Sequence, residues 1–262
     1  MKHIRHSSRA NQGTLMGQEL YRTEDKFGTI LVTQRENKRI LSFDSKLEQS
    51  CVLINKPYYL MHEYTQAMLL GLLFTNAQTM TCLGLGGGGL VHCLTHYFPQ
   101  ASISVIEIRK AVIDIAYQWF HVPKSESLTI INADAFAYML ELPACSSDII
   151  FSDLYEAEGM SACQAQDSFV SSCYQSLSKS GCLVLNFHQL PHRDSTLVKT
   201  LKRLFCALIV FDTGDKDDKN SILFCCKSAP DLHHPLLNEK AERLSQQVKM
   251  PLLYYYQKLE SY

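Results

Sequence analysis

A run of glycines in the middle of the chain is the feature of this sequence most directly suited to binding a ligand. The run, Leu83-Gly-Leu-Gly-Gly-Gly-Gly89, lies between a predicted strand and a predicted helix. Glycine permits a tight turn and lets a ligand approach bare backbone, and the helix that follows offers unpaired N–H groups at its N-terminus. The spacing of Gly84, Gly86 and Gly89 fits the dinucleotide pattern GxGxxG. Gly84, Gly86 and Gly88 equally fit GxGxG, which is typical of adenosylmethionine enzymes.

Carboxylates at the ends of the neighbouring predicted strands narrow this prediction. Glu107 ends the strand after the glycine run, where a carboxylate can accept hydrogen bonds from both hydroxyls of a ribose. Asp134 follows the next strand and can accept from an exocyclic amine, while the N–H of Ala135 can face a ring nitrogen. Asp134 also fits the N-cap of the helix that follows, and the two roles are compatible. Together these residues predict a site for an adenosine-type ligand.

A third carboxylate, Asp153, closes a continuous apolar strand at the same edge of the predicted sheet. It can hold an amine or act as a general base on one, although a turn or helix cap would also explain it. Tyr155 and Glu156 follow it, in the region where residues that contact an acceptor are expected. His188, at the end of the next strand, is a further candidate base.

The elements that position these residues alternate between strand and helix. From about residue 79 the strands are apolar at nearly every position, which predicts an α/β fold with a parallel sheet covered by helices on both faces. Before them, short strands with turns predict a small antiparallel hairpin unit. The predicted strands are 28–34, 39–43, 79–85, 102–107, 128–132, 148–152, 182–187, 208–212 and 221–226, and the predicted helices are 59–74, 90–96, 111–120, 165–177 and 195–205. We expect a tail over 1–15, a β domain over 16–55 and a nucleotide-binding domain over 56–262.

The bulk composition excludes several classes of protein. The 262 residues are 46% hydrophobic, with 25 Lys and Arg against 26 Asp and Glu, a net charge of -1. This balance argues against nucleic acid as the main partner. No secretory signal and no apolar run of membrane-spanning length are visible, so we expect a cytoplasmic protein without a membrane partner. The ten cysteines form no CxxC pair, which favours free thiols in the core over a metal site.

On these residues the chain resembles the spermidine synthase family from about Gly17 to Cys226, in particular its spermidine-synthase-like branch. Gly86-Gly87-Gly88 matches the family's GGG, and Asp153 falls on the catalytic aspartate of its Asp-x-x-Asp motif, with Glu156 in the second acidic position. The resemblance implies a seven-stranded, mostly parallel Rossmann-like sheet preceded by a small antiparallel β-hairpin domain, commonly assembled as a homodimer. It also implies these donor-binding residues: Gln49, Glu63, Gly84, Gly86, Gly88, Glu107, Asp134 and Ala135.

The chain departs from the family at the acceptor side. The aspartate that follows GGG in the family, and binds the free amine of decarboxylated adenosylmethionine, is Gly89 here. Met61 replaces a tyrosine, and Glu156 is longer than the second aspartate of the motif. The donor site is thus expected to carry over better than the acceptor site.

The sequence therefore predicts a transferase that uses adenosylmethionine or its decarboxylated form, without a metal, and transfers a methyl or aminopropyl group to a small, amine-bearing acceptor such as a polyamine. Asp153, with Glu156, is expected to face that acceptor. Two alternatives stay open. One is an NAD-binding oxidoreductase, which the glycines permit. The other is a non-catalytic relative that retains only the bound nucleotide.

Overall fold

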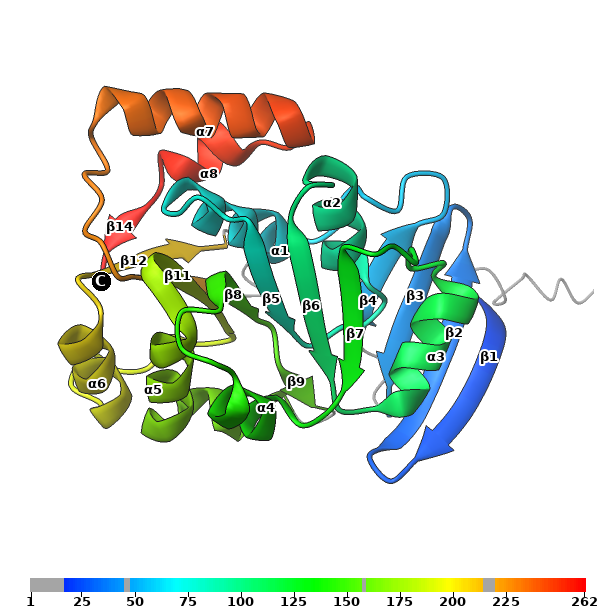
Figure 1. Cartoon of the computed structure of the whole chain (residues 1–262). Coiled ribbons are helices and arrows are strands. Elements are labelled where there is room, and N and C mark those ends of the chain that lie inside the picture. The colour runs from blue at the N-terminus through cyan, green and yellow to red at the C-terminus, as the bar shows by residue number, and fades with distance from the viewer. Residues whose placement is uncertain (1–16, 45–47, 157–158, 214–219) are drawn as a thin grey trace, which may run out of the picture.

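Two β-sheets form the framework of the chain (Figure 1), for which the computed structural model describes residues 17–44, 48–156, 159–213 and 220–262. A four-stranded sheet has the order β1-β2-β3-β4, and an eight-stranded sheet has the order β14-β12-β13-β11-β8-β5-β6-β7. The strands are β1 (Gln18–Asp25), β2 (Gly28–Arg35), β3 (Lys38–Phe43), β4 (Glu48–Leu53), β5 (Thr79–Leu83), β6 (Ser102–Glu107), β7 (Leu128–Asn132), β8 (Ser147–Ser152), β9 (Tyr155–Glu156), β10 (Gly159–Met160), β11 (Leu177–Phe187), β12 (Ala207–Asp212), β13 (Ser221–Cys226) and β14 (Glu260–Ser261). The helices are α1 (Glu63–Met68), α2 (Gly89–Tyr97), α3 (Lys110–Trp119), α4 (Ala135–Glu141), α5 (Asp167–Ser176), α6 (Thr196–Leu204), α7 (Pro235–Val248) and α8 (Leu252–Tyr256), with 3₁₀ turns η1 (Leu69–Leu73) and η2 (Ala162–Ala165).

The N-terminal sheet contains the hairpin predicted from the sequence. Strands β2 and β3 pair antiparallel, and the turn between them places Glu36 at a positive φ of 51°. Strands β1 and β4 extend this hairpin on either side, also antiparallel. Ile30, Val32 and Leu41 are fully buried, so one face of this small sheet packs against the rest of the molecule.

The large sheet confirms the predicted α/β class. Strands β11, β8, β5, β6 and β7 run parallel to their neighbours in that order, whereas β13 and β12 complete the sheet as antiparallel strands. These are the seven strands implied by the family resemblance. The short strand β14 adds an eighth at the edge, beside β12. The parallel strands bring the residues that follow β5, β6, β7 and β8 to one edge of the sheet.

Helices cover both faces of this sheet, and each face has its own apolar core. Helices α1, α2, α3, α7 and α8 contribute to one core, together with the N-terminal sheet, and α4, α5 and α6 contribute to the other. Neighbouring residues of a strand divide between the two cores because side chains alternate across a sheet. Cys226, for example, belongs to the first core and its neighbour Cys225 to the second.

Two of the predicted elements begin several residues away from their predicted starts. The helix predicted over 59–74 begins only at Glu63 and continues as a 3₁₀ turn from Leu69, because Leu60 is held in a β-bridge with Val52. Strand β11 begins at Leu177, before the predicted residue 182, with an irregular register up to Cys182. In both places a tertiary contact overrides the local pattern of apolar residues.

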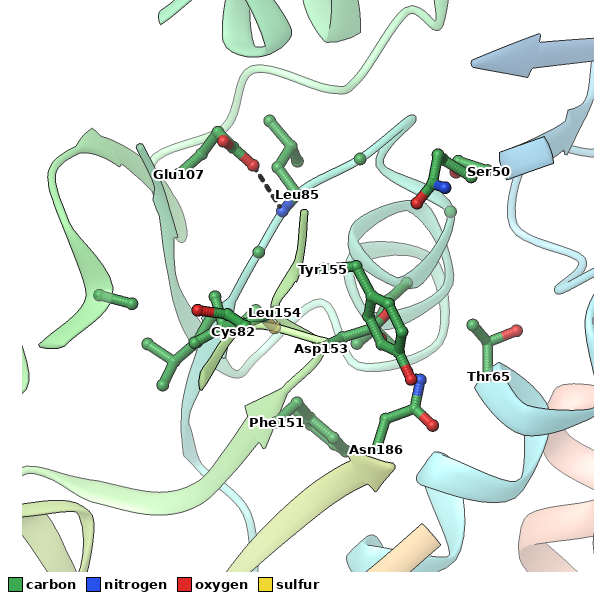
Figure 2. Close-up of a pocket in the computed structure, with 18 of the residues that line it drawn as sticks. Ser50, Thr65, Cys82, Leu85, Glu107, Phe151, Asp153, Leu154, Tyr155 and Asn186 are labelled. Atoms are coloured by element: carbon green, nitrogen blue, oxygen red, sulfur yellow. Dashed lines mark hydrogen bonds between the residues drawn. The ribbon is translucent and has the colours of Figure 1, made fainter. Parts of the chain in front are cut away.

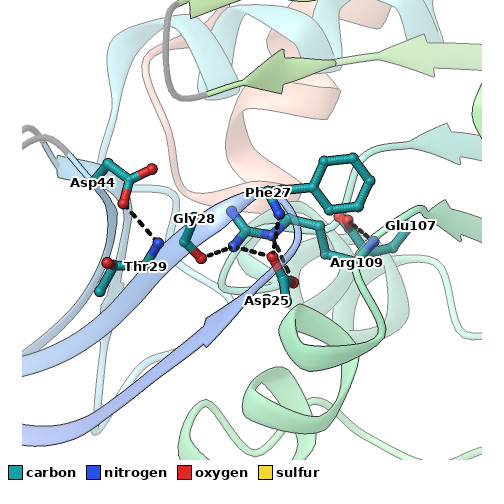
Figure 3. Close-up of polar contacts among 7 residues, drawn as sticks. All are labelled: Asp25, Phe27, Gly28, Thr29, Asp44, Glu107 and Arg109. Carbon is teal, nitrogen blue, oxygen red and sulfur yellow. Dashed lines mark hydrogen bonds and ion pairs between the residues drawn. The ribbon is translucent and has the colours of Figure 1, made fainter.

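An arginine two residues after the end of β6 joins the two sheets (Figure 3). The Arg109 guanidinium donates to the Asp25 carboxylate at 2.8 Å and to the Gly28 carbonyl at 2.8 Å. The guanidinium also lies 4.5 Å from the centre of the Phe43 ring, a cation–π distance. Burial opposes ionisation of Asp25, but the hydrogen bonds from Arg109 and from the Phe27 N–H outweigh it, so the pKa of Asp25 is lowered. Arg109 therefore fixes the N-terminal sheet against the edge of the large sheet at the end of β6.

Candidate active site

A cavity of about 970 Å³ opens at the carboxyl edge of the parallel strands. The glycine run, the ends of β6 and β8, the start of α4, strand β4 and the segment before α1 all contribute to its wall. Seven residues proposed from the sequence line it: Gln49, Gly84, Gly86, Glu107, Asp134, Ala135 and Asp153. The fold thus brings most of the predicted site residues to one place.

The glycine run adopts the tight turn that its composition predicts. Gly84, Gly86 and Gly88 have φ values of 94°, 53° and 76°, which side chains other than glycine rarely adopt. A Cβ atom on Gly84 would lie 2.4 Å from the carbonyl oxygen of Asp153, so this glycine permits the close approach of β5 and β8. Gly88, also proposed from the sequence to bind the donor, is the N-cap of α2 and does not line the cavity, and a Cβ atom on it would lie 2.3 Å from Val122.

Glu107 lies at the wall of the cavity with its carboxylate anchored by backbone. Its Oε2 accepts from the Leu85 N–H at 3.1 Å and its Oε1 from the Arg109 N–H at 2.8 Å, and Figure 2 shows the first of these bonds. Burial raises the pKa of Glu107, although both N–H groups stabilise its charged form. Each carboxylate oxygen can accept a second hydrogen bond, so the group retains the capacity to hold ribose hydroxyls.

The sequence left two roles open for Asp134, an N-cap and a contact with an adenine amine, and the structure shows the first. Its Oδ1 accepts from the Ala137 N–H at 2.8 Å, which makes Asp134 the N-cap of α4. Asp134 and Ala135 also line the cavity. A carboxylate has acceptor sites beyond the one that the cap uses, so the cap leaves the proposed contact with an adenine amine open.

Asp153 follows β8 next to the glycine run, and its carboxylate is held by side chains from distant parts of the chain. The Asn186 side chain donates to Asp153 Oδ1 at 2.8 Å. Burial raises the pKa of Asp153, against the stabilising effects of Asn186, His62, Tyr64 and His188 on its charged form. A carboxylate with a raised pKa at a cavity wall fits a general base.

The wall beyond Asp153 is polar and aromatic. The Tyr155 hydroxyl donates to Asn220 Oδ1 at 3.3 Å, and its ring meets the His188 ring edge to face at 5.0 Å. Figure 2 shows Tyr155 and Asn186 pointing toward one another. These residues surround the space in which an acceptor would approach Asp153.

Besides Gly88, the predicted site residue Glu63 does not line the cavity, and Glu156 falls outside the part of the chain whose side chains are described. Glu63 is the first residue of α1 and is absent from the residues that line the cavity. Glu156 lies in β9, which pairs with β10, but its side chain falls outside the described residues. The role of Glu156 toward the acceptor therefore stays a prediction.

Sequence reasoning missed several residues that line the cavity. Ser50 on β4 accepts from the Gly87 N–H at 3.0 Å and so holds the glycine run against the N-terminal sheet. A side-chain hydrogen bond with Tyr64 stabilises the charged form of Asp153. The Arg109 N–H donates to the Glu107 carboxylate. Arg109 had a local signal, since it lies two residues after Glu107, but its partners become visible only in the fold.

The described part of the chain holds no group of three or more His, Cys, Asp or Glu side chains arranged to hold a metal ion. Within the same residues, no helix has the length and apolar character needed to span a bilayer.

Known proteins are similar to this chain in both sequence and structure. No protein-family model matches the chain. A polyamine aminopropyltransferase of Neisseria meningitidis serogroup A is 26% identical over 222 residues, which are 84% of this chain and 84% of that protein. An eEF1A lysine and N-terminal methyltransferase of Xenopus laevis is 28% identical over 226 residues, which are 78% of this chain but 32% of that protein.

Two solved structures share the fold. A spermidine synthase in complex with the transition-state analogue AdoDATO superposes with a TM-score of 0.72 and 14% identity, over 92% of this chain and 84% of that one. Human methyltransferase-like protein 13 in complex with SAH gives a TM-score of 0.60 and 26% identity, over 73% of this chain and 94% of that one. The resemblance inferred from the sequence is confirmed: this chain is a relative of the polyamine aminopropyltransferases and of the methyltransferases that share their fold.

Proposed function

We propose that the protein is a transferase that binds an adenosyl sulfonium nucleotide and transfers one of its alkyl groups to an amine. The observation that carries this proposal is the position of Asp153, with its raised pKa, directly beside the glycine run. A base and a nucleotide cradle are thereby adjacent, which is the arrangement that group transfer from a sulfonium needs.

The order of the strands supports an orientation for the nucleotide. Along the edge of the sheet, Asp134 follows β7, Glu107 follows β6, the glycine run follows β5 and Asp153 follows β8. In this orientation the adenine lies near Asp134 and Ala135, the ribose lies at Glu107, and the sulfonium lies over the glycine run. The acceptor then reaches the sulfonium from the side of Asp153 and Asn186.

The proposed reaction needs little beyond alignment and one base. The acceptor nitrogen attacks the carbon attached to the sulfonium, and a C–N bond forms as the C–S bond breaks. The electron pair of the broken bond stays on sulfur, which becomes a neutral thioether. The proton lost from the acceptor amine passes to the Asp153 carboxylate. Alignment of the reacting atoms supplies much of the rate acceleration, and a positioned base adds roughly 10²–10⁴-fold.

An amine is the acceptor that both groups of relatives suggest. One relative is named for a polyamine and the other for a lysine and an N-terminus, and all of these present a nitrogen nucleophile. The proposed acceptor is therefore a small amine, with a polyamine as the first to test and a lysine side chain as the second. Location in the cytoplasm and assembly as a homodimer stay predictions from the sequence.

Calorimetric titration tests the nucleotide part of the proposal. Adenosylmethionine, its decarboxylated form, methylthioadenosine and NAD are titrated side by side into the purified protein. We expect saturable binding of the adenosyl compounds, weakened in Glu107→Gln, because the amide offers one acceptor oxygen where the carboxylate offers two. Binding of NAD alone would favour the oxidoreductase alternative. Binding of none of the adenosyl compounds would overturn the proposal.

Transfer is tested by mass spectrometry of reactions that contain a donor and a panel of amines, including putrescine, spermidine and a lysine peptide. We expect an increase in the mass of one acceptor class by a methyl or an aminopropyl group, together with the thioether product. Tight donor binding without any mass change would favour the non-catalytic alternative.

A further inference from the structure

A glutamate and a histidine lie side by side at the wall of the cavity, where the proposed adenosine contacts leave them unused. Glu48 begins β4 and His62 is the residue before α1, and both line the cavity. His62 Nε2 lies 3.3 Å from Glu48 Oε1, and the two side chains are 23% and 39% exposed. The pair therefore presents a carboxylate and an imidazole side by side at the cavity wall.

Contacts of neighbouring residues place this pair beside the glycine run. Ser50, two residues after Glu48, accepts from the Gly87 N–H at 3.0 Å. Leu60, two residues before His62, lies 3.9 Å from where a Cβ atom on Gly89 would be. The charge of His62 also stabilises the carboxylate of Asp153. The segments that carry the pair thus contact the glycine run, and His62 lies close enough to Asp153 to influence its carboxylate.

His62 has an unused hydrogen-bonding atom at this position. Its Nε2 is shielded from water and makes no hydrogen bond within the described part of the chain, because the contact with Glu48 lacks hydrogen-bond geometry. Buried polar atoms are nearly always hydrogen-bonded in native structures, and leaving one unsatisfied is costly. A small turn of the imidazole toward the cavity that it lines would let an acceptor atom of a bound ligand satisfy it.

The chemistry of the pair fits an amino acid. A carboxylate and an imidazole N–H side by side complement an ammonium and a carboxylate that are also side by side, as in the α-amino acid end of adenosylmethionine. The decarboxylated donor presents only an ammonium, and methylthioadenosine presents neither group. We propose that Glu48 and His62 bind the amino acid end of intact adenosylmethionine and make the site selective for that donor, which implies methyl transfer. This inference rests on the proposed function, since it assumes that an adenosyl sulfonium occupies the cavity.

The same pair could simply fasten β4 to the segment before α1. A fastening role would affect every ligand equally, because it would act through the shape of the cavity. A binding role would affect only those ligands that carry the matching group. Comparison of ligands with and without the amino acid end therefore separates the two roles.

The experiment measures dissociation constants of the three adenosyl compounds for the unaltered chain, Glu48→Gln and His62→Gln, with Glu239→Gln as a control that removes an exposed carboxylate on α7. For the unaltered chain we expect affinity to fall from adenosylmethionine to the decarboxylated donor by about tenfold or more. Glu48→Gln should weaken both ammonium-bearing compounds by about tenfold and leave methylthioadenosine unchanged. His62→Gln should weaken adenosylmethionine alone, and the control should change nothing.

Equal affinity of the unaltered chain for the intact and decarboxylated donors would overturn the inference while leaving the proposed function in place, and it needs no variant to fold. Equal losses for all three compounds in Glu48→Gln would also overturn it, in favour of a fastening role. If the unaltered chain binds none of the three, the proposed function fails and the inference fails with it.

Discussion

The two halves of the cavity are built in different ways. In the half proposed for the nucleoside, carboxylates are held by backbone N–H groups: Glu107 by Leu85 and Arg109, and Asp134 by Ala137. In the half proposed for the acceptor, side chains hold side chains that lie far apart in the sequence. Asp153 and Asn186 are separated by 33 positions, and Tyr155 and Asn220 by 65.

The two halves should therefore differ in how strongly they depend on the identity of their side chains. Backbone donors are present whatever the side chains are, so the nucleoside half depends on a few glycines and carboxylates at strand ends. The acceptor half depends on the identity of several side chains from separate elements. We therefore expect substitutions in the acceptor half to change the reaction, and substitutions in the glycine run to damage the site or the fold.

Asp153→Asn should have the largest effect on the reaction. Loss of the base is expected to lower the transfer rate by roughly 10²–10⁴-fold, while donor affinity stays within about twofold. In the unaltered chain the rate should rise with pH through a pKa above the ordinary aspartate value, because only the ionised carboxylate accepts the proton and burial raises its pKa. The variant should lack this limb of the pH profile. A variant with normal turnover would remove Asp153 from the mechanism.

Gly84→Ala should have the largest effect on stability. Its φ of 94° and a Cβ position 2.4 Å from the Asp153 carbonyl oxygen leave no room for a side chain, so we expect a loss of about 3 kcal/mol or more in the free energy of unfolding. Gly89→Ala is the matched control within the same run. Its Cβ would lie 3.8 Å from its nearest neighbour and its φ is outside the left-handed region. The control should be neutral or stabilising by up to about 1 kcal/mol. Urea unfolding of both variants makes the measurement, and equal stabilities would contradict the prediction.

Asp25→Asn should weaken the attachment of the N-terminal sheet by about 1–2 kcal/mol at neutral pH. The value is below that of a fully buried pair because the Asp25 side chain is 23% exposed. The pKa of Asp25 is lowered in the folded state, so its contribution is present above the unfolded pKa of about 3.9 and is lost as pH falls through the lower folded value. Unfolding experiments at neutral and acidic pH should therefore show the two proteins converging in acid.

Glu19→Gln is the control for that variant, since it removes a carboxylate from an exposed ion pair with Arg22 on the same sheet. We expect no measurable change in the free energy of unfolding, at either pH. A loss as large as that of Asp25→Asn would show that the sheet responds to its total charge and not to the contact with Arg109.

The contrast between the two halves also explains which features the sequence could predict. The glycine run, Glu107 and Asp134 each lie where a predicted strand ends, so their meeting at one edge follows from a parallel sheet alone. Asn186, near the carboxyl end of β11 beside β8, meets Asp153 by the same rule. The contact of Asp153 with Tyr64 could not be predicted in this way, because Tyr64 lies outside the sheet and reaches Asp153 only through the packing of α1. The late start of α1 has the same origin, since the bridge from Leu60 to Val52 is a tertiary contact.

Gly89→Asp should have the smallest of these effects and tests how the two halves are connected. A carboxylate at the first residue of α2 would attract the ammonium of a donor and repel its α-carboxylate, and the position near a helix N-terminus tolerates negative charge. Val52 and Leu60 lie 3.8 and 3.9 Å from the Cβ position, so the side chain can be accommodated. We expect the ratio of affinities to shift toward the decarboxylated donor by about tenfold, or about 1.4 kcal/mol.

Gly89→Asn controls for the size of the new side chain, and its affinity ratio should stay close to that of the unaltered chain. An equal shift in both variants would assign the change to shape and not to charge. If Glu48 already binds the ammonium, the second carboxylate at position 89 should add less in the unaltered background than in Glu48→Gln. The size of that difference measures how much Glu48, and not the residue at position 89, contributes to binding of the donor ammonium in the unaltered chain.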